Sequence, residues 1–316
     1  MSGSLKSASS SLRNCVLFLA AAVFGIALAS GQDRQEPSGP QSREARKVSP
    51  EDVALADHPM QSALRIAEQT AQLIEREVKD YTCDLVMRER IRGRLGNMLF
   101  AEMKVRVEPN DNADGINPFS VYLRFTAPAN VKDREVLYVH GQHNGKMVAR
   151  NGGQSNLKDV TLVMKPDSNR AMRGRHYPIT EIGMGNIIER LIEEARVAMH
   201  VDRDRWECEF KIIENARIEG RVCRCVQVAF PQKRENLKFH VVRVFIDRET
   251  GLPIRFAAYS WPLEPGGSPR LIEEYTFLNL QVNVGLSESD FDRENPEYRF
   301  YSANENADRQ SSSPDE

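Results

Sequence analysis

Two groups of arginines are the residues best suited to bind a charged partner. The first lies on one face of a strand-like segment and its turn and consists of Arg88, Arg90, Arg92 and Arg94. The second lies in a short segment before a helical pattern: Arg170, Arg173, Arg175 and His176. Guanidinium groups bind phosphate and carboxylate groups through paired hydrogen bonds. Each group therefore predicts contact with an anionic head group, a phosphate or a partner protein, with a solvated surface as the alternative.

Catalytic residue patterns are incomplete in this sequence. The carboxylates of Glu193-Glu194 and of Glu273-Glu274 are adjacent, so the two members of each pair point in different directions and cannot share a proton. We expect both pairs to be solvated. Ser155 and Lys158 have the spacing of S-x-x-K, but the partner motifs of such a nucleophile are missing. The sequence favours a protein that is not an enzyme, and a hydrolase whose residues meet only in the fold is the alternative.

Three segments match cofactor or metal loops only in part. Gly183–Ile188 begins like a dinucleotide loop, but no strand leads directly into it, so the segment predicts the start of a helix. Gly141–Lys146 resembles a phosphate loop and is better explained as a hairpin turn. The segment from Asn110 to Gly115 begins like a calcium loop, but Val121 stands where a bidentate glutamate belongs. We expect no metal ion and no cofactor.

The N-terminus has the features of an export signal. Residues 1–31 carry two basic residues, then the apolar run Val16–Ala29, then small residues. The run has 14 residues, fewer than the about 20 that a membrane span needs, so we expect cleavage and regard an uncleaved anchor as the alternative. Removal of two basic residues changes the formal net charge from −2 to −4. The protein is expected in the periplasm or outside the cell, with only peripheral membrane contact and no nucleic-acid partner.

The cysteines do not identify a single disulfide pairing. Cys15 lies before the apolar run, and four cysteines follow the signal: Cys83, Cys208, Cys223 and Cys225. An exported protein with four cysteines can form two disulfide bonds in any of three pairings. A Cys-x-Cys metal site and free thiols in the core are the alternatives.

One patterned block lies between two polar segments. Residues 32–50 and 302–316 contain little to bury and predict a disordered linker and tail, which leaves 51–301 as a single domain. Met60, Leu64, Ala67, Ala71, Ile74 and Val78 recur at helical spacing, and a second helical face lies between Thr180 and His200. Alternating apolar residues predict strands over 81–87, 99–107 and 119–125, joined by turns such as 94–96. Further strands are expected at 135–140, 146–150, 160–165, 207–213, 221–230, 238–247, 253–261, 271–282 and 297–301.

These elements predict an α+β fold. Parallel strands would each need a crossover helix, and the pattern provides only two helices. We therefore expect a large curled antiparallel sheet of about ten to twelve strands, with an N-terminal helix and an inserted helix. The concave face of such a sheet either encloses a ligand or is filled as a core. The candidate wall residues are Leu85, Met87, Leu99, Met103, Val105, Val121, Leu123 and Phe125.

The order of elements resembles the bacterial lipoprotein-carrier superfamily, which includes LolA, LolB and RseB. The segments that carry this resemblance are Tyr122–Phe125 with Pro128, the hairpin at Gly141–Val148, and Asp247–Pro253 leading into Ile254–Tyr259. From Tyr81-Thr82-Cys83 to Asn295–Phe300, the chain more closely resembles secreted planctomycete proteins described as domain of unknown function 1571.

The superfamily resemblance implies a half-open barrel that holds acyl chains or a hydrophobic partner segment. We therefore expect a non-enzymatic envelope protein that binds a lipid, a lipoprotein acyl chain or another apolar ligand in the concave face. The alternative is an interaction or sensor module of the sigma-factor-regulator type, in which an envelope protein contacts the arginines. The partner contacts would then be Arg88, Arg90, Arg92, Arg173 and Arg175.

Overall fold

The computed structural model describes residues 58–107, 119–154, 158–202 and 207–300. The expected signal peptide, linker and tail lie outside these residues, as do the segment from Asn110 to Gly115 and Ser155. The signal peptide and the domain limits therefore stay predictions.

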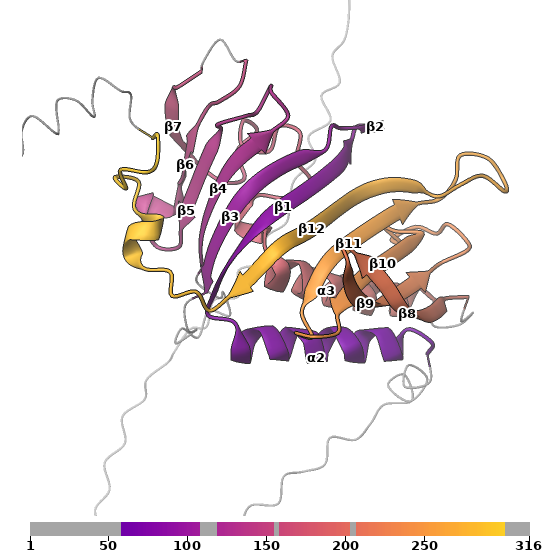
Figure 1. The fold of residues 1–316 in the computed structure, drawn as a ribbon. Helices are drawn as coiled ribbons and strands as arrows, with labels where there is room; N and C mark the ends of the chain where they lie inside the picture. The colour runs from indigo at the N-terminus through magenta and orange to yellow at the C-terminus, as the bar shows by residue number, and fades with distance from the viewer. Residues whose placement is uncertain (1–57, 108–118, 155–157, 203–206, 301–316) are drawn as a thin grey trace, which may run out of the picture. The chain divides into compact units, whose positions relative to one another are not determined.

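Twelve antiparallel strands form one sheet (Figure 1). Its order is β7-β6-β5-β4-β3-β1-β12-β11-β10-β9-β8, and the short β2 pairs with β1. One half of the sheet contains β1 (Asp80–Ile91), β2 (Arg94–Leu95), β3 (Leu99–Val107), β4 (Phe119–Ala127), β5 (Glu135–Val139), β6 (Met147–Arg150) and β7 (Thr161–Met164). The other contains β8 (Glu209–Ile218), β9 (Arg221–Ala229), β10 (Val241–Asp247), β11 (Pro253–Ser260) and β12 (Arg270–Val282). Because β7 and β8 are edge strands, the sheet is not closed. The antiparallel sheet, together with its helices, confirms the predicted α+β class.

Within the described residues, two α-helices lie on one face of the sheet, α2 (Gln61–Glu77) and α3 (Met184–Asp202). Figure 1 shows the sheet curving around α3, and we call the face that carries the helices the concave face. The start of α3 depends on Gly183, which has a φ of 106° and lies so close to the Tyr81 hydroxyl that a Cβ would be 2.9 Å from it. The predicted helix start is therefore confirmed. No helix in the described ranges is long and apolar enough to cross a membrane.

Alternation along the strands produces two apolar layers. On the concave face, Leu85, Met103 and Val121 are almost fully buried beside the helices. On the convex face, Tyr122 and Leu137 pack against a C-terminal segment that contains Tyr298 and Phe300. The Tyr122 and Tyr298 rings are stacked, with centroids 3.8 Å apart.

The strand predicted at 297–301 is wrong for its described part, because Glu297 to Phe300 form no strand. The alternation is real, but its aromatic side chains cover the convex face of β4 and β5 instead of extending the sheet. The backbone N–H of Arg299 donates a 2.9 Å hydrogen bond to the buried Glu135 carboxylate. The Glu135 carboxylate thus accepts the hydrogen bond that a carbonyl oxygen of a partner strand would accept in a sheet.

All four described cysteines are free thiols within the protein interior. Burial raises the pKa of Cys225 to about 11 and that of Cys208 to about 12, so these groups are neutral at ordinary pH. The alternative of free core thiols therefore describes this structure.

Candidate functional site

A cavity of about 340 Å³ lies on the concave face between strands β1 and β4–β7, helix α3 and the segment 166–182. Its apolar wall comes mainly from the sheet: Met87, Leu123, Phe125, Val136, Met147, Ala149, Leu162 and Met164. We call it the arginine-rimmed cavity because five arginines and only two glutamates line it: Arg134, Arg170, Arg173, Arg175 and Arg190, with Glu89 and Glu181. An apolar wall with a few charged groups is typical of ligand sites.

The arginines differ in their partners. Arg175 lies 3.7 Å from the Glu89 carboxylate and above the Phe125 ring, and Arg190 lies 3.8 Å from Glu181. The Nε of Arg134 is buried without a hydrogen-bond partner. Burial and the nearby Arg175 both lower the pKa of Arg134. An anionic group in the cavity would supply the missing acceptor and reduce the repulsion between these two guanidinium groups.

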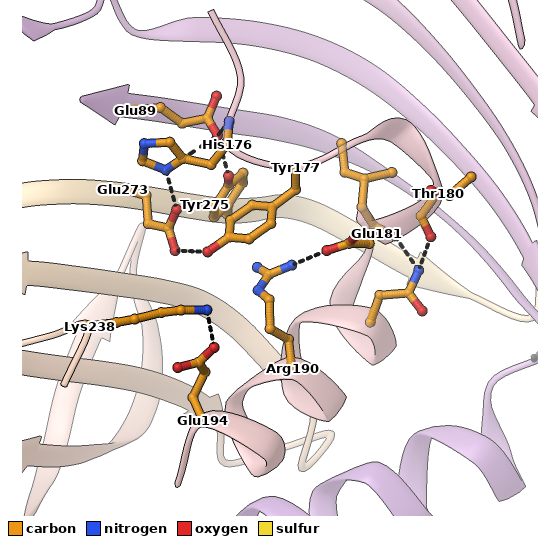
Figure 2. A network of polar contacts seen from close by, with 12 residues as sticks. Glu89, His176, Tyr177, Thr180, Glu181, Arg190, Glu194, Lys238, Glu273 and Tyr275 are labelled. Atoms are coloured by element: carbon orange, nitrogen blue, oxygen red, sulfur yellow. Dashed lines mark hydrogen bonds and ion pairs between the residues drawn. The ribbon is translucent and has the colours of Figure 1, made fainter. Parts of the chain in front are cut away.

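Glu89, His176 and Glu273 form a polar cluster (Figure 2), and Glu89 also lines this cavity. Glu89 on β1 and Glu273 on β12 are direct partners across the antiparallel pair, and both side chains are almost fully buried. His176 Nδ1 is 2.6 Å from Glu273 Oε2 and 3.9 Å from Glu89 Oε1. Its Nε2 is 3.0 Å from the Arg90 carbonyl oxygen. Like charges directly opposite each other destabilise a sheet, and in this structure Arg175, 3.7 Å from Glu89, and His176, 2.6 Å from Glu273, offset the two carboxylates.

Two tyrosines hold the carboxylates of this cluster. The Tyr275 hydroxyl donates to Glu89 at 2.7 Å, and the Tyr177 hydroxyl donates to Glu273 at 3.1 Å. Burial, together with the neighbouring glutamates, raises the pKa of both tyrosines, which keeps them protonated as donors. The hydrogen bond to Glu273 raises the pKa of His176. Arg190 lies over the Tyr177 ring, 3.6 Å from its centroid, and so joins α3 to the cluster.

A second cavity of about 90 Å³ lies between α2, α3 and strands β9 and β10. We call it the inter-helix cavity. Its wall is apolar with few exceptions, and its residues include Leu64, Ile188, Val226, Val228 and Val244. It is much smaller than the arginine-rimmed cavity because both helices insert side chains over this half of the sheet.

The eight candidate wall residues separate into two groups. Met87, Leu123 and Phe125 line the arginine-rimmed cavity. The other five lie in the apolar core and line neither cavity: Leu85, Leu99, Met103, Val105 and Val121. A cavity is thus present on the concave face, where β1 and β4–β7 lie under the segment 166–182 and the first turns of α3.

The two arginine groups lie apart. Arg173 and Arg175 are at the arginine-rimmed cavity, and Arg173 is exposed. Arg88 and Arg90 alternate with the inward Met87 and Glu89, so they lie on the convex face, where they donate to backbone carbonyls of Gly96 and Leu271. Arg92 is exposed in the turn after β1.

The expectation that Glu273 and Glu274 are solvated is wrong. Their side chains do point in opposite directions, but both are buried. Glu273 meets His176 on the concave face, whereas Glu274 pairs with Arg255 on the convex face. Sequence reasoning missed the cluster because Glu89, His176 and Glu273 are far apart in the chain. The available signal was a carboxylate at an inward position of each of two alternating strands.

Residues 78–300 match the family described as "Protein of unknown function (DUF1571)". The chain therefore belongs to the DUF1571 family. No curated protein matches the sequence.

Three of the solved structures that resemble this chain are the following. A DUF1329 protein from Desulfovibrio piger is 14% identical, with 74% of this chain and 97% of that chain covered and a TM-score of 0.35. A lipoprotein-sorting protein domain from Vibrio parahaemolyticus is 14% identical, with 73% and 96% covered and a TM-score of 0.31. The MucA/MucB complex from Pseudomonas aeruginosa is 15% identical, with 73% and 60% covered and a TM-score of 0.39.

Proposed function

We propose that this DUF1571 protein is a non-enzymatic envelope protein that binds an amphiphile, an apolar chain with an anionic end, in the arginine-rimmed cavity. The observation that carries the proposal is the pairing of an apolar wall with the unpartnered, buried Nε of Arg134. Export by the predicted signal peptide of residues 1–31 is part of the proposal. The ligand class then includes lipids and acylated proteins of the envelope.

The apolar wall supports a chain-shaped ligand. Met87, Leu123 and Phe125 present side chains to the cavity from adjacent or nearby strands. Each Å² of apolar surface removed from water contributes about 25 cal/mol, so a chain that contacts several such residues gains substantial affinity. Three of the wall residues are methionines, Met87, Met147 and Met164, and their flexible side chains adapt to ligands of different shape.

The arginines support an anionic end. Arg134 and Arg175 lie close enough for Arg175 to lower the pKa of Arg134, while Arg170 and Arg173 line the same cavity and are exposed. A phosphate or carboxylate bridging Arg134 and Arg175 gains charge-assisted hydrogen bonds from both. The protein as a whole has a formal net charge of −2, so five arginines against two glutamates at this cavity are a local excess of positive charge.

The test uses calorimetry on the full chain with three probes: decyl phosphate, decanol and inorganic phosphate. We expect decyl phosphate to bind most tightly, decanol more weakly, and inorganic phosphate not measurably. Equal binding of decyl phosphate and decanol contradicts the anionic end, and binding of inorganic phosphate alone contradicts the apolar chain. Absence of binding by all three contradicts the proposed function.

Arg134→Met tests the arginine, with Arg92→Met as its matched control on the exposed turn. Loss of one charge-assisted interaction of about 1.5–3 kcal/mol should weaken decyl phosphate binding by at least about tenfold and leave decanol binding unchanged. Arg92→Met should alter neither. An equal effect of both variants would show that overall charge, not the cavity, determines the affinity.

Ala171→Phe tests the cavity itself, because Ala171 lines it from the segment 166–182. The added ring should occupy the space and abolish binding of both decyl phosphate and decanol. Ala216→Phe on β8, which lines neither cavity, is the control. Unchanged binding in Ala171→Phe would place the ligand elsewhere.

The native ligand is identified by mass spectrometry of the intact protein purified from its own envelope. A stoichiometric lipid or acylated peptide supports the proposal. A clean apo mass that is unchanged after incubation with envelope lipids favours the interaction-module alternative. Arg173→Glu combined with Arg175→Glu should then weaken capture of an envelope protein.

A further inference from the structure

We propose that Glu89, His176 and Glu273 form a binding site for a divalent first-row metal ion, with zinc as the natural occupant. One ligand atom from each residue lies within 4.8 Å of the others. One imidazole nitrogen and two carboxylate oxygens are donors that zinc commonly takes. The residues come from β1, β12 and the segment 166–182, so a bound ion would tie that segment to the centre of the sheet. The inference does not depend on the proposed ligand.

The hydrogen bonds of His176 fix which ring nitrogen faces the carboxylates. Nε2 is 3.0 Å from the carbonyl oxygen of Arg90, and a carbonyl oxygen only accepts, so Nε2 carries a hydrogen. This is the arrangement of metal-binding histidines, in which the other ring N–H donates to a backbone carbonyl or a carboxylate. Nδ1 therefore points at Glu273 Oε2, 2.6 Å away, and a cation must lie between them, either a proton or a metal ion.

The distances suit a small ion after a modest adjustment. Donors bound tetrahedrally to zinc lie roughly 3.3 Å apart, given zinc–ligand distances of about 2.0–2.2 Å. The Nδ1 separations of 2.6 Å from Glu273 and 3.9 Å from Glu89 lie on either side of this value. His176 belongs to an irregular segment, so its ring can move by the required fraction of an ångström while β1 and β12 hold the two carboxylates.

A second layer of residues is already in place. Tyr275 and Tyr177 donate to the two carboxylates, and such outer partners orient metal ligands. Glu89, Tyr177 and Tyr275 also line the arginine-rimmed cavity, so the proposed metal site adjoins that cavity. An ion that replaces the proton of His176 makes the local charge more positive, which would strengthen attraction for an anionic ligand there.

The experiment measures zinc binding to the chelator-stripped full chain by calorimetry and by metal analysis after desalting. We expect one tightly held ion per chain. His176→Gln and Glu273→Gln should each lose it, whereas Glu274→Gln should retain it. Glu274 is the matched control because it is the adjacent buried carboxylate on the opposite face, paired with Arg255. Zinc binding that is absent in the original protein, or unchanged in His176→Gln and Glu273→Gln, overturns the proposal.

Glu273→Gln leaves the fold at risk, so a second measurement is made without it. Tyr275→Phe removes only the hydroxyl that holds Glu89 and should weaken zinc about 10- to 100-fold. Cobalt added to the unaltered protein should give a visible spectrum typical of mixed nitrogen and oxygen ligands, and that spectrum should disappear in His176→Gln. A cobalt spectrum that persists in His176→Gln also overturns the site. Decyl phosphate binding measured in the same stripped protein tests the proposed function separately.

Discussion

On the concave face, strands β9 and β10 lie under both helices, whereas strands β4 to β7 lie under the irregular segment 166–182. The first half encloses the inter-helix cavity of about 90 Å³ with an apolar wall, and the second encloses the arginine-rimmed cavity of about 340 Å³. The sheet is continuous and antiparallel across both halves. The difference therefore comes from what covers the strands. A helix inserts a regular row of side chains that fills the sheet surface, and a loop leaves room for a ligand.

Neighbouring residues of α3 offer a direct test of this difference. Ile187 lines the arginine-rimmed cavity and Ile188 the inter-helix cavity, and both are almost fully buried. Replacement of either by alanine should lower the free energy of unfolding by about 2–5 kcal/mol, measured by urea denaturation. Only Ile187→Ala enlarges the proposed ligand site, so only this variant should shift the preference from decyl phosphate toward longer alkyl phosphates.

The chain-length preference of the two variants also tests whether the two cavities are separate and whether either of them binds a ligand. If Ile188→Ala changes the chain-length preference as much as Ile187→Ala does, the two cavities act as one ligand site. If neither variant changes it while both lower stability, both cavities are packing defects of an ordinary core. Circular dichroism spectra matching the unaltered protein are required before either result is interpreted.

The sequence predicts the sheet well because alternation is a local property. Leu85 and Met87 on β1, with Met103 on β3, occupy inward positions as their spacing requires. It does not distinguish wall from core, since Met103 and Met87 have the same pattern and only Met87 borders a cavity. That distinction depends on where the segment 166–182 crosses the sheet. The Glu89–His176–Glu273 cluster is hidden for the same reason, because strand register brings the two glutamates together and the segment 166–182 supplies His176.

The turn after β10 contacts helix α2 in the helix-covered half of the sheet. A substitution in this turn is expected to have the next largest effect on the free energy of unfolding. Asp247 is buried and accepts hydrogen bonds from Arg221 and Thr250, while Gly251 lies against Leu73 of α2. Asp247→Asn removes the charge but keeps the shape. It should lower the free energy of unfolding by about 1–3 kcal/mol, the usual cost of disrupting charged hydrogen bonds. Ligand affinity in the arginine-rimmed cavity should be unchanged.

The stabilisation that ionised Asp247 provides depends on pH in a direction that follows from its pKa. Burial raises the pKa of Asp247, but hydrogen bonds from Arg221 and Thr250 lower it by a larger amount. The pKa of Asp247 in the folded protein therefore lies below the ordinary value of 3.8. The stabilisation is therefore fully present above that value and is lost as the pH falls through the lower folded pKa. The difference in stability between Asp247→Asn and the unaltered protein should shrink across this acid range. A constant difference down to the lowest pH would contradict the ionic role of Asp247.

The smallest effect is expected on the convex face, where the C-terminal segment packs against β4, β5 and β6 and forms ion pairs with β3. Its ion pair between Glu288 and Arg106 joins a side chain that is 79% exposed to one that is 14% exposed. Exposed pairs contribute about 0–1 kcal/mol, so Glu288→Gln should reduce stability by no more than this, and less at high salt. Tyr298→Ala should cost several times more, because it removes the ring stacked on Tyr122. If Glu288→Gln were the more damaging change, charge and not aromatic packing would hold the segment in place, and salt would release it.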